Sequence, residues 1–311
     1  MYIYFLNKQN LDLSVAEVLA LAKTKVYTLV GNCLLLAELV DYKRLAYTKR
    51  VYELLFETAE EHLIEAVHTY DFNRVFKESF RLRLVNGKDF DVEALANIIW
   101  QNLKIPVTNM RDAKTKIDII FCEKVFCCLL VGEQDDRFED RKAHLRPYNH
   151  PTSLHPRLAR CLVNLVHSEE ILDPFCGSGG LLIEAGLIGL KTFGYDIDDI
   201  MLKRAEANLK FFEVKNFKVE KHDALRIEKK FEAIVTDLPY GKNSKVDDLQ
   251  KTFSEFLKNS FNFTEKMVVV FPDFVDAKKL IKTVNWKIKN TFSYYIHKTL
   301  TKEIFVLGKH V

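Results

Sequence analysis

The sequence is poor in the residues that break a chain or staple it together. Glycine and proline number only 11 and 7 in 311 residues, which argues against a disordered or collagen-like chain. The six cysteines include no Cys-x-x-Cys pair and no repeated ligand spacing, so a zinc site is not indicated and buried, reduced thiols are expected. We therefore predict a folded globular protein without a metal ion.

A large net charge and a long apolar run are also missing. Lysine and arginine number 46 against 43 for aspartate and glutamate, so any surface for a nucleic acid must be a local patch. No window approaches the roughly 18 apolar residues of a membrane helix. The start, MYIYFLNKQNLDLS, has no basic segment followed by an apolar run. We expect a soluble, cytoplasmic protein with no membrane contact.

The hydrophobic pattern divides the chain into three folded parts and a linker. Strand-like and helix-like spacings alternate over residues 1–58 and again over residues 59–135, which predicts two small α+β units. Prolines and a loss of apolar periodicity predict an extended linker over residues 136–155. From residue 156 to residue 311, strands and helices alternate regularly. This last part predicts an α/β domain with a mostly parallel sheet and a C-terminal antiparallel hairpin.

The strongest local signal is ILDPFCGSGG at residues 171–180, an apolar strand that enters a glycine-rich turn and opens a helix. Gly177 and Gly179 lack a Cβ, so the backbone can come close to a ligand. A dinucleotide-binding turn needs a third glycine where this chain has Leu182. Asp173 would repel a pyrophosphate but attract an amino group. The turn therefore predicts a site for a cofactor that carries an amino group and is not a dinucleotide.

Two more acids follow the next two strands of this part. Asp196 ends one strand and can take both hydroxyls of a ribose, and Asp223 ends the next, near an adenine amino group. Each acid alone is more often a helix cap or a solvated loop residue. Three acids at the ends of three successive strands favour a shared binding role.

A second strong signal is IVTDLPYG at residues 234–241, which ends a strand on the same carboxyl edge. Alone it would be an ordinary Pro-Tyr-Gly turn. Together with residues 171–180 it resembles motifs I and IV of class I amino-methyltransferases, whose fourth motif reads Asp/Asn-Pro-Pro-Tyr. The resemblance implies a class I, Rossmann-like domain with S-adenosyl-L-methionine as cofactor and a nitrogen conjugated to a base as acceptor.

The resemblance also implies a role for each residue of the fourth motif. The Asp237 carboxylate and the Leu238 carbonyl would accept the two N–H groups of the amine and aim its lone pair at the methyl group. Tyr240 would stack on the base. Leu238 stands where the family commonly has proline, but Pro239 still favours an extended Leu238. The implied catalytic residues are Asp237, Leu238, Pro239 and Tyr240, and the implied cofactor residues are Asp173, Pro174, Phe175, Gly177, Ser178, Gly179, Asp196, Ile197, Asp223 and Ala224.

The segment RPYNHPTSLHPRLAR at residues 146–160 resembles the segment before the catalytic domain in tRNA guanosine-10 N2-methyltransferases of the archaeal single-chain type. That family implies a ferredoxin-like unit at residues 1–58 and a THUMP RNA-binding domain at residues 59–135. It also implies tRNA as partner and one or two methyl groups on N2 of guanosine. Eukaryotic relatives use an activating protein partner; a monomer is expected otherwise.

Basic residues near the THUMP and linker regions are candidates for contacts with RNA phosphates. Arg81 and Arg83 share one face of a predicted strand, Arg111 and Lys114 cluster in a loop, and Arg146 belongs to a stretch without acids. A solvated charged face explains the first four equally well. His150 and His155 lack cysteine or acidic partners nearby, so a metal site is not indicated.

Several alternatives remain open on the sequence. The same chemistry could act on guanosine 6 of tRNA or on a ribosomal guanine, because related THUMP enzymes share both motifs. An adenine-N6 DNA methyltransferase needs the same acceptors, but the N-terminal units do not resemble a DNA target-recognition domain. A non-catalytic RNA-binding protein with a retained cofactor fold is a further alternative, against which the intact motifs argue.

Overall fold

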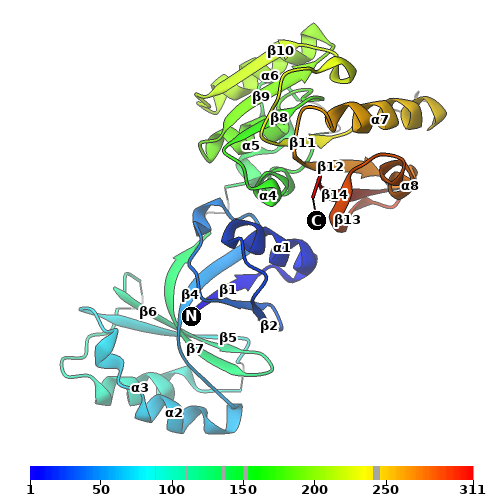
Figure 1. The fold of residues 1–311 in the computed structure, drawn as a ribbon. Helices are drawn as coiled ribbons and strands as arrows, with labels where there is room; N and C mark the ends of the chain where they lie inside the picture. The colour runs from blue at the N-terminus through cyan, green and yellow to red at the C-terminus, as the bar shows by residue number, and fades with distance from the viewer. Residues whose placement is uncertain (88, 110, 135–136, 150–152, 241–245, 311) are drawn as a thin grey trace. The chain divides into compact units, whose positions relative to one another are not determined.

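The computed structural model describes residues 1–310 except 88, 110, 135–136, 150–152 and 241–245. Within the described residues the chain forms two compact units, each built around a seven-stranded sheet (Figure 1). The first unit comprises residues 1–11, 22–43 and 48–135, and the second comprises residues 12–21, 44–47 and 136–311. The second unit is thus assembled from three separate stretches of chain.

The first unit is a mixed sheet with helices from its second half. Its elements are β1 (Tyr2–Leu6), β2 (Thr28–Val30), β3 (Cys33–Leu36), β4 (Thr48–Thr58), α2 (Leu63–Thr69), β5 (Phe80–Val85), α3 (Val92–Asn102), β6 (Thr115–Phe121) and β7 (Val125–Glu133). The strand order is β2-β3-β1-β4-β7-β6-β5, and among the described strands of this sheet only β5 and β6 pair in parallel. Strand β4 pairs with β1 on one side and β7 on the other. The strands of residues 1–58 and 59–135 therefore form one continuous sheet.

The second unit is an α/β domain. Its elements are α1 (Leu11–Ala22), α4 (Pro156–Val166), β8 (Glu170–Asp173), α5 (Gly180–Leu187), β9 (Lys191–Asp196), α6 (Asp199–Phe211), β10 (Phe217–Lys221), β11 (Ile234–Asp237), α7 (Val246–Ser260), β12 (Lys266–Pro272), α8 (Ala277–Lys282), β13 (Lys287–His297) and β14 (Leu300–Gly308). The strand order is β10-β9-β8-β11-β12-β14-β13. The first five strands are parallel, and β14 is antiparallel to both β12 and β13. The predicted parallel sheet and the C-terminal hairpin are confirmed.

Helices cover both faces of this sheet because its central strands are apolar on both faces. In β11, Ile234 packs with α7 and α8, whereas Val235 packs with α1, α4 and α5. Both side chains are fully buried, and each such burial contributes about 1.5–3 kcal/mol. The apolar cores on the two faces of the sheet hold the strand ends in place, and the predicted site residues lie at these ends.

Helix α1 is anchored to the second unit by a buried carboxylate. Glu17 is 0% exposed and accepts hydrogen bonds from Ala46 N at 2.8 Å, Tyr47 N at 3.0 Å and Asn164 Nδ2 at 2.7 Å. Burial raises the pKa of Glu17, and these donors oppose the rise. Leu13 adds an apolar contact to the same core. The second unit therefore needs residues from near the start of the chain.

Part of the expected linker also packs onto the second unit. Phe138 is 1% exposed, and the guanidinium groups of Arg141 and Arg157 each lie 4.8 Å from its ring centroid. Arg141 also donates to the buried carboxylate of Glu184, at 2.7 and 3.1 Å.

None of the helices formed by the described residues is long and apolar enough to cross a membrane.

Candidate active site

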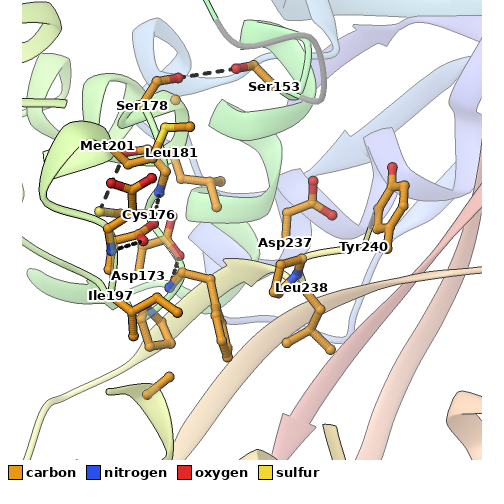
Figure 2. Close-up of a pocket in the computed structure, with 18 of the residues that line it drawn as sticks. Ser153, Asp173, Cys176, Ser178, Leu181, Ile197, Met201, Asp237, Leu238 and Tyr240 are labelled. Atoms are coloured by element: carbon orange, nitrogen blue, oxygen red, sulfur yellow. Dashed lines mark hydrogen bonds between the residues drawn. The ribbon is translucent and has the colours of Figure 1, made fainter. Parts of the chain in front are cut away.

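A cavity of about 620 Å³ opens at the carboxyl edge of the second sheet. Figure 2 shows Asp173 and Cys176 on one side of it and Asp237 and Tyr240 on the other. Of the predicted cofactor and catalytic residues, the lining includes Asp173, Pro174, Phe175, Gly177, Ser178, Asp196, Ile197, Asp223, Ala224, Asp237, Leu238, Pro239 and Tyr240. Gly179 is not in the lining but caps the start of α5, next to it. The structure thus brings the two sequence motifs to one cavity.

The glycine-rich turn presents bare backbone to this cavity. Gly177 and Gly179 have φ angles of 49° and 85°, in the left-handed region that favours glycine. A Cβ on Gly177 would meet no atom within 4 Å, whereas a Cβ on Gly179 would lie 3.3 Å from that of Ala205. Gly177 therefore leaves open space beside the cavity, and Gly179 allows α5 and α6 to pack closely.

Asp173 is a buried carboxyl group at the end of β8. It is 2% exposed, and its Oδ1 accepts hydrogen bonds from Thr236 Oγ1 at 2.7 Å and from Phe175 N at 3.2 Å. Burial raises the pKa of Asp173 to about 7, and the nearby Asp237 and Asp196 carboxylates add to the rise. A cation bound in the cavity would stabilise the charged form of Asp173 and so lower its pKa.

Asp196 and Asp223 shape the loops after β9 and β10. Asp196 accepts from Gly177 N and from its own loop at Asp198 N, both at 2.9 Å. Asp223 accepts from Leu225 N at 2.9 Å. Both acids therefore fill the capping role of ordinary turn residues and also border the cavity. Their remaining acceptor capacity is available to a ligand.

The fourth-motif residues lie at the end of β11. Oδ2 of Asp237 accepts a hydrogen bond from Lys302 Nζ, and Oδ1 is buried with no hydrogen-bond partner among the described residues. Burial raises the pKa of Asp237, and Lys302 opposes the rise. The Leu238 side chain is 1% exposed, and its N–H donates to Val270 O at 3.1 Å. The backbone N–H that a proline would lack is thus used to extend the pairing of β11 with β12.

Several residues of this site were not predicted from the sequence. Thr236 lies inside the IVTD motif, but only the fold shows that it bonds Asp173. Lys302 lies on β14, 65 residues from Asp237, and no local motif identifies it. The cavity is also lined by Leu249 and Thr252 of α7, which the sequence analysis did not assign.

Three of the four predicted RNA-binding residues of the first unit line a separate cleft. Arg81 and Arg83 both form ion pairs with the buried Asp118. Together with Arg111 and Lys116 they line an open cleft of about 650 Å³. Lys114 is not in this lining and pairs with exposed Asp112 at 3.6 Å.

Arg146 does not have the exposed position that a phosphate contact requires. It is 5% exposed, and its Nε donates to Arg141 O at 3.0 Å. Both of its terminal nitrogens lack a hydrogen-bond partner among the described residues. Burial lowers the pKa of Arg146.

Among the residues that the structure describes, the cysteines and histidines form no recognisable metal centre. All six cysteines are free thiols, and no group of three potential metal ligands occurs in the described part of the chain. His155 caps α4 by accepting from Arg157 N at 3.2 Å. His150, Pro151 and Thr152 of the quoted segment 146–160 and Gly241 of the quoted segment 234–241 lie outside the described residues.

The sheet order, the glycine-rich turn and the DLPY segment define a class I methyltransferase. The whole chain resembles the crystal structure of TrmN from Thermus thermophilus, with a TM-score of 0.52 and 16% identity over 99% of each chain. A methylase structure from Clostridium difficile 630 gives the same TM-score over 99% of this chain and 97% of its own. These likenesses confirm the fold. The family model of the RMKL-like methyltransferase domain matches residues 143–302.

The chain is also similar in sequence to named archaeal enzymes. It is 31% identical to the tRNA (guanine(10)-N2)-dimethyltransferase of Pyrococcus abyssi, over 95% of this chain and 96% of that one. It is 33% identical to the enzyme of the same name from Methanothermobacter thermautotrophicus, over 86% and 84% of the two chains. The chain belongs to the family that these methyltransferases represent.

Proposed function

We propose that this protein transfers methyl groups from S-adenosyl-L-methionine to the exocyclic N2 of guanosine 10 in tRNA, in the cytoplasm. The observation that carries the proposal is the single cavity that joins the cofactor turn to the DLPY segment. Family membership supports the substrate, because relatives that align over almost the whole chain are named for this reaction. Their names also support a dimethylated product.

The residues present fit the cofactor. Asp173, Asp196 and Asp223 stand at the ends of three neighbouring parallel strands and border the same cavity, so they can hold an amino group, a ribose and an adenine. Gly177 adds the open backbone that a bound ligand can approach. When bound, S-adenosylmethionine supplies a methyl group on a cationic sulfur.

The chain's own residues would hold the acceptor base. The N2 lone pair of guanine is delocalised into the ring, so the site must orient the amine before it can react. The free Oδ1 of Asp237 accepts one N–H, the Leu238 carbonyl accepts the other, and Tyr240 stacks on the base. The proton that the methylated amine releases can pass to Asp237.

The first unit would bind the tRNA. We propose residues 1–58 as a ferredoxin-like unit and residues 59–135 as a THUMP domain, with Arg81, Arg83 and Arg111 in the basic cleft and Lys114 nearby. Such residues fix position through phosphates rather than through base sequence. The proposal includes tRNA as partner, and a monomer unless an activating protein is used as in eukaryotic relatives.

The test is transfer of labelled methyl groups from S-adenosylmethionine to unmodified tRNA transcripts, followed by nucleoside analysis. N2-methylated guanosine is expected, and it should vanish from a transcript with guanosine 10 replaced. An Asp237→Ala protein should bind cofactor and tRNA but transfer no methyl group. Label that persists in the substituted transcript would move the target to another guanosine, and label in duplex DNA or none at all would refute the proposal.

A further inference from the structure

The C-terminal hairpin carries a buried lysine that reaches the catalytic segment. The side chain of Lys302, on β14, is 3% exposed. Its Nζ donates to Oδ2 of Asp237 and lies 5.1 Å from the ring centroid of Tyr240. We propose that Lys302 is a positioning residue for methyl transfer, which holds the Asp237 carboxylate and the Tyr240 ring in the arrangement that receives the guanine. The inference rests on the proposed function.

The sheet register explains how residues so far apart in sequence come together. Val235 of β11 and Ile304 of β14 point into the same core. Asp237 lies two residues after Val235, and Lys302 lies two residues before Ile304 on a strand that runs antiparallel to β12. Both residues therefore share that face near the carboxyl edge of the parallel strands. Strand β12 separates the two strands. A side chain as long as lysine is needed to reach across it.

The burial of Lys302 has a free-energy cost that a packing role alone does not explain. Removing an ammonium group from water is unfavourable, and a buried ion pair often stabilises a protein no better than apolar residues of the same volume. A methionine at position 302 would fill similar space without that cost. The contact with two residues of the fourth motif therefore indicates a role in the site rather than in packing alone.

The ion pair with Lys302 gives the two carboxylate oxygens of Asp237 different roles. Lys302 occupies Oδ2, which leaves the buried and unpartnered Oδ1 to accept an N–H of the guanine amine. Transfer would exchange the S–CH3 bond of the sulfonium for an N–CH3 bond and leave a neutral thioether. The N–H bond of the methylated amine would then break and its proton would pass to Oδ1, which leaves a neutral carboxyl beside the ammonium. The charge on Lys302 then favours release of that proton to water when the product leaves.

The electrostatic setting of Asp237 gives this role a measurable signature. Burial raises its pKa, and Lys302 on β14 opposes the rise. Asp173 on β8 is the other charged group that interacts with it among the described residues, and Tyr240 lies beside the ammonium. Without Lys302, the carboxylate should therefore keep its proton to a higher pH.

The experiment is a pH series of single-turnover methyl transfer to tRNA by the full chain. We expect Lys302→Met to lower the rate at pH 7 by about 10-fold or more, within the range for an impaired proton acceptor. The acid limb of its pH–rate profile should move to higher pH and the rates should converge at alkaline pH. Lys302→Arg should restore the limb. If Lys302→Met folds poorly, Lys302→Gln takes its place in the series. Glutamine keeps a hydrogen bond but not the charge, so its acid limb should also move to higher pH.

The matched control is Lys309→Met, directly after the end of β14. Lys309 pairs with Glu265 at 2.8 Å and lies 4.9 Å from the Phe261 ring centroid, so it has the same kinds of contact away from the cavity. Its profile should keep the wild-type limb. A Lys302→Met profile with an unmoved limb, or one lowered equally at every pH, would overturn the inference.

A failure of the proposed function can be told apart from a failure of this inference. If wild type methylates no tRNA, the proposed function is wrong and the inference about transfer falls with it. A double-mutant cycle of Asp237→Asn and Lys302→Met on thermal unfolding then still measures the ion pair. If wild type methylates tRNA, the pH profile alone decides the role of Lys302.

Discussion

Replacing Asp173 with asparagine should make the second unit more stable at pH 8 while making it a poorer binder of cofactor. Burial raises the pKa of Asp173 from 3.8 to about 7. At about 1.4 kcal/mol per pKa unit, this rise corresponds to a destabilisation of about 4 kcal/mol once the carboxyl is ionised in both states. Below pH 4 both states are protonated and the penalty is absent. Stability is therefore lost as the pH rises from about 4 to about 7.

Asparagine carries no charge and keeps an oxygen for the hydrogen bonds from Thr236 and Phe175. Urea unfolding of wild type and Asp173→Asn from pH 5 to pH 8.5 should show a difference in unfolding free energy that grows with pH and levels off near pH 7. At pH 8 the melting temperature should rise by roughly 10 °C. Asp223→Asn is the control, because Asp223 is 43% exposed and its replacement should change little.

The same substitution should have the opposite effect on the cofactor. The wild-type affinity for S-adenosylmethionine should fall as the pH drops below about 7, because protonation removes the charge that attracts its amino group. The affinity of Asp173→Asn should be at least about 10-fold lower at pH 8, or roughly 1.4 kcal/mol, and flat across this range. A variant less stable than wild type at pH 8, or a stability difference that does not depend on pH, would refute the reasoning.

Three further outcomes are expected. Tyr240→Ala should slow methyl transfer by about 10–100-fold through loss of base stacking worth about 1–3 kcal/mol, whereas Tyr240→Phe should stay near wild type; single-turnover rates check this, and equal losses would exclude stacking. Arg111→Ala should weaken tRNA binding and reduce the salt slope of log K by about one, measured by filter binding; an unchanged slope would remove Arg111 from the interface. Glu17→Ala should destabilise the second unit by about 3 kcal/mol because it leaves the buried backbone N–H groups of Ala46 and Tyr47 unpaired; urea unfolding measures this, and a loss below about 1 kcal/mol would contradict it.

The residues that line the cavity could be predicted because their signals are local. The turn at residues 171–180 and the DLPY segment each follow an apolar strand, and parallel strands place their carboxyl ends on one edge. Helix α7 was not predicted, although Leu249, Phe253, Phe256 and Leu257 have helical spacing in the sequence. This spacing could have predicted the helix, but residues 246–260 contain no catalytic motif that drew attention to them.

Lys302 and Arg146 show what local reasoning could not supply. The contact of Lys302 with Asp237 depends on the antiparallel register of β14 on β12, which no short stretch of sequence encodes. Arg146 lies in a stretch of basic residues and polar loop residues, which predicts exposure, but the fold buries it beside Gly180. The continuous sheet through β4 likewise depends on pairing between distant strands.

The attachment of α1 to the second unit has a consequence for synthesis of the protein. Glu17 and its partner Asn164 are 147 residues apart, so at about 5–20 residues per second the helix leaves the ribosome roughly 7–30 s before the surface that receives it. During that interval Leu13 and the neighbouring apolar side chains have no core to enter. A fragment that starts at residue 136 would meet the converse problem, since it can fold only with a hole where α1 and residues 44–47 belong. The gene therefore cannot be cut between its N-terminal and catalytic parts without exposing the interior of the enzyme.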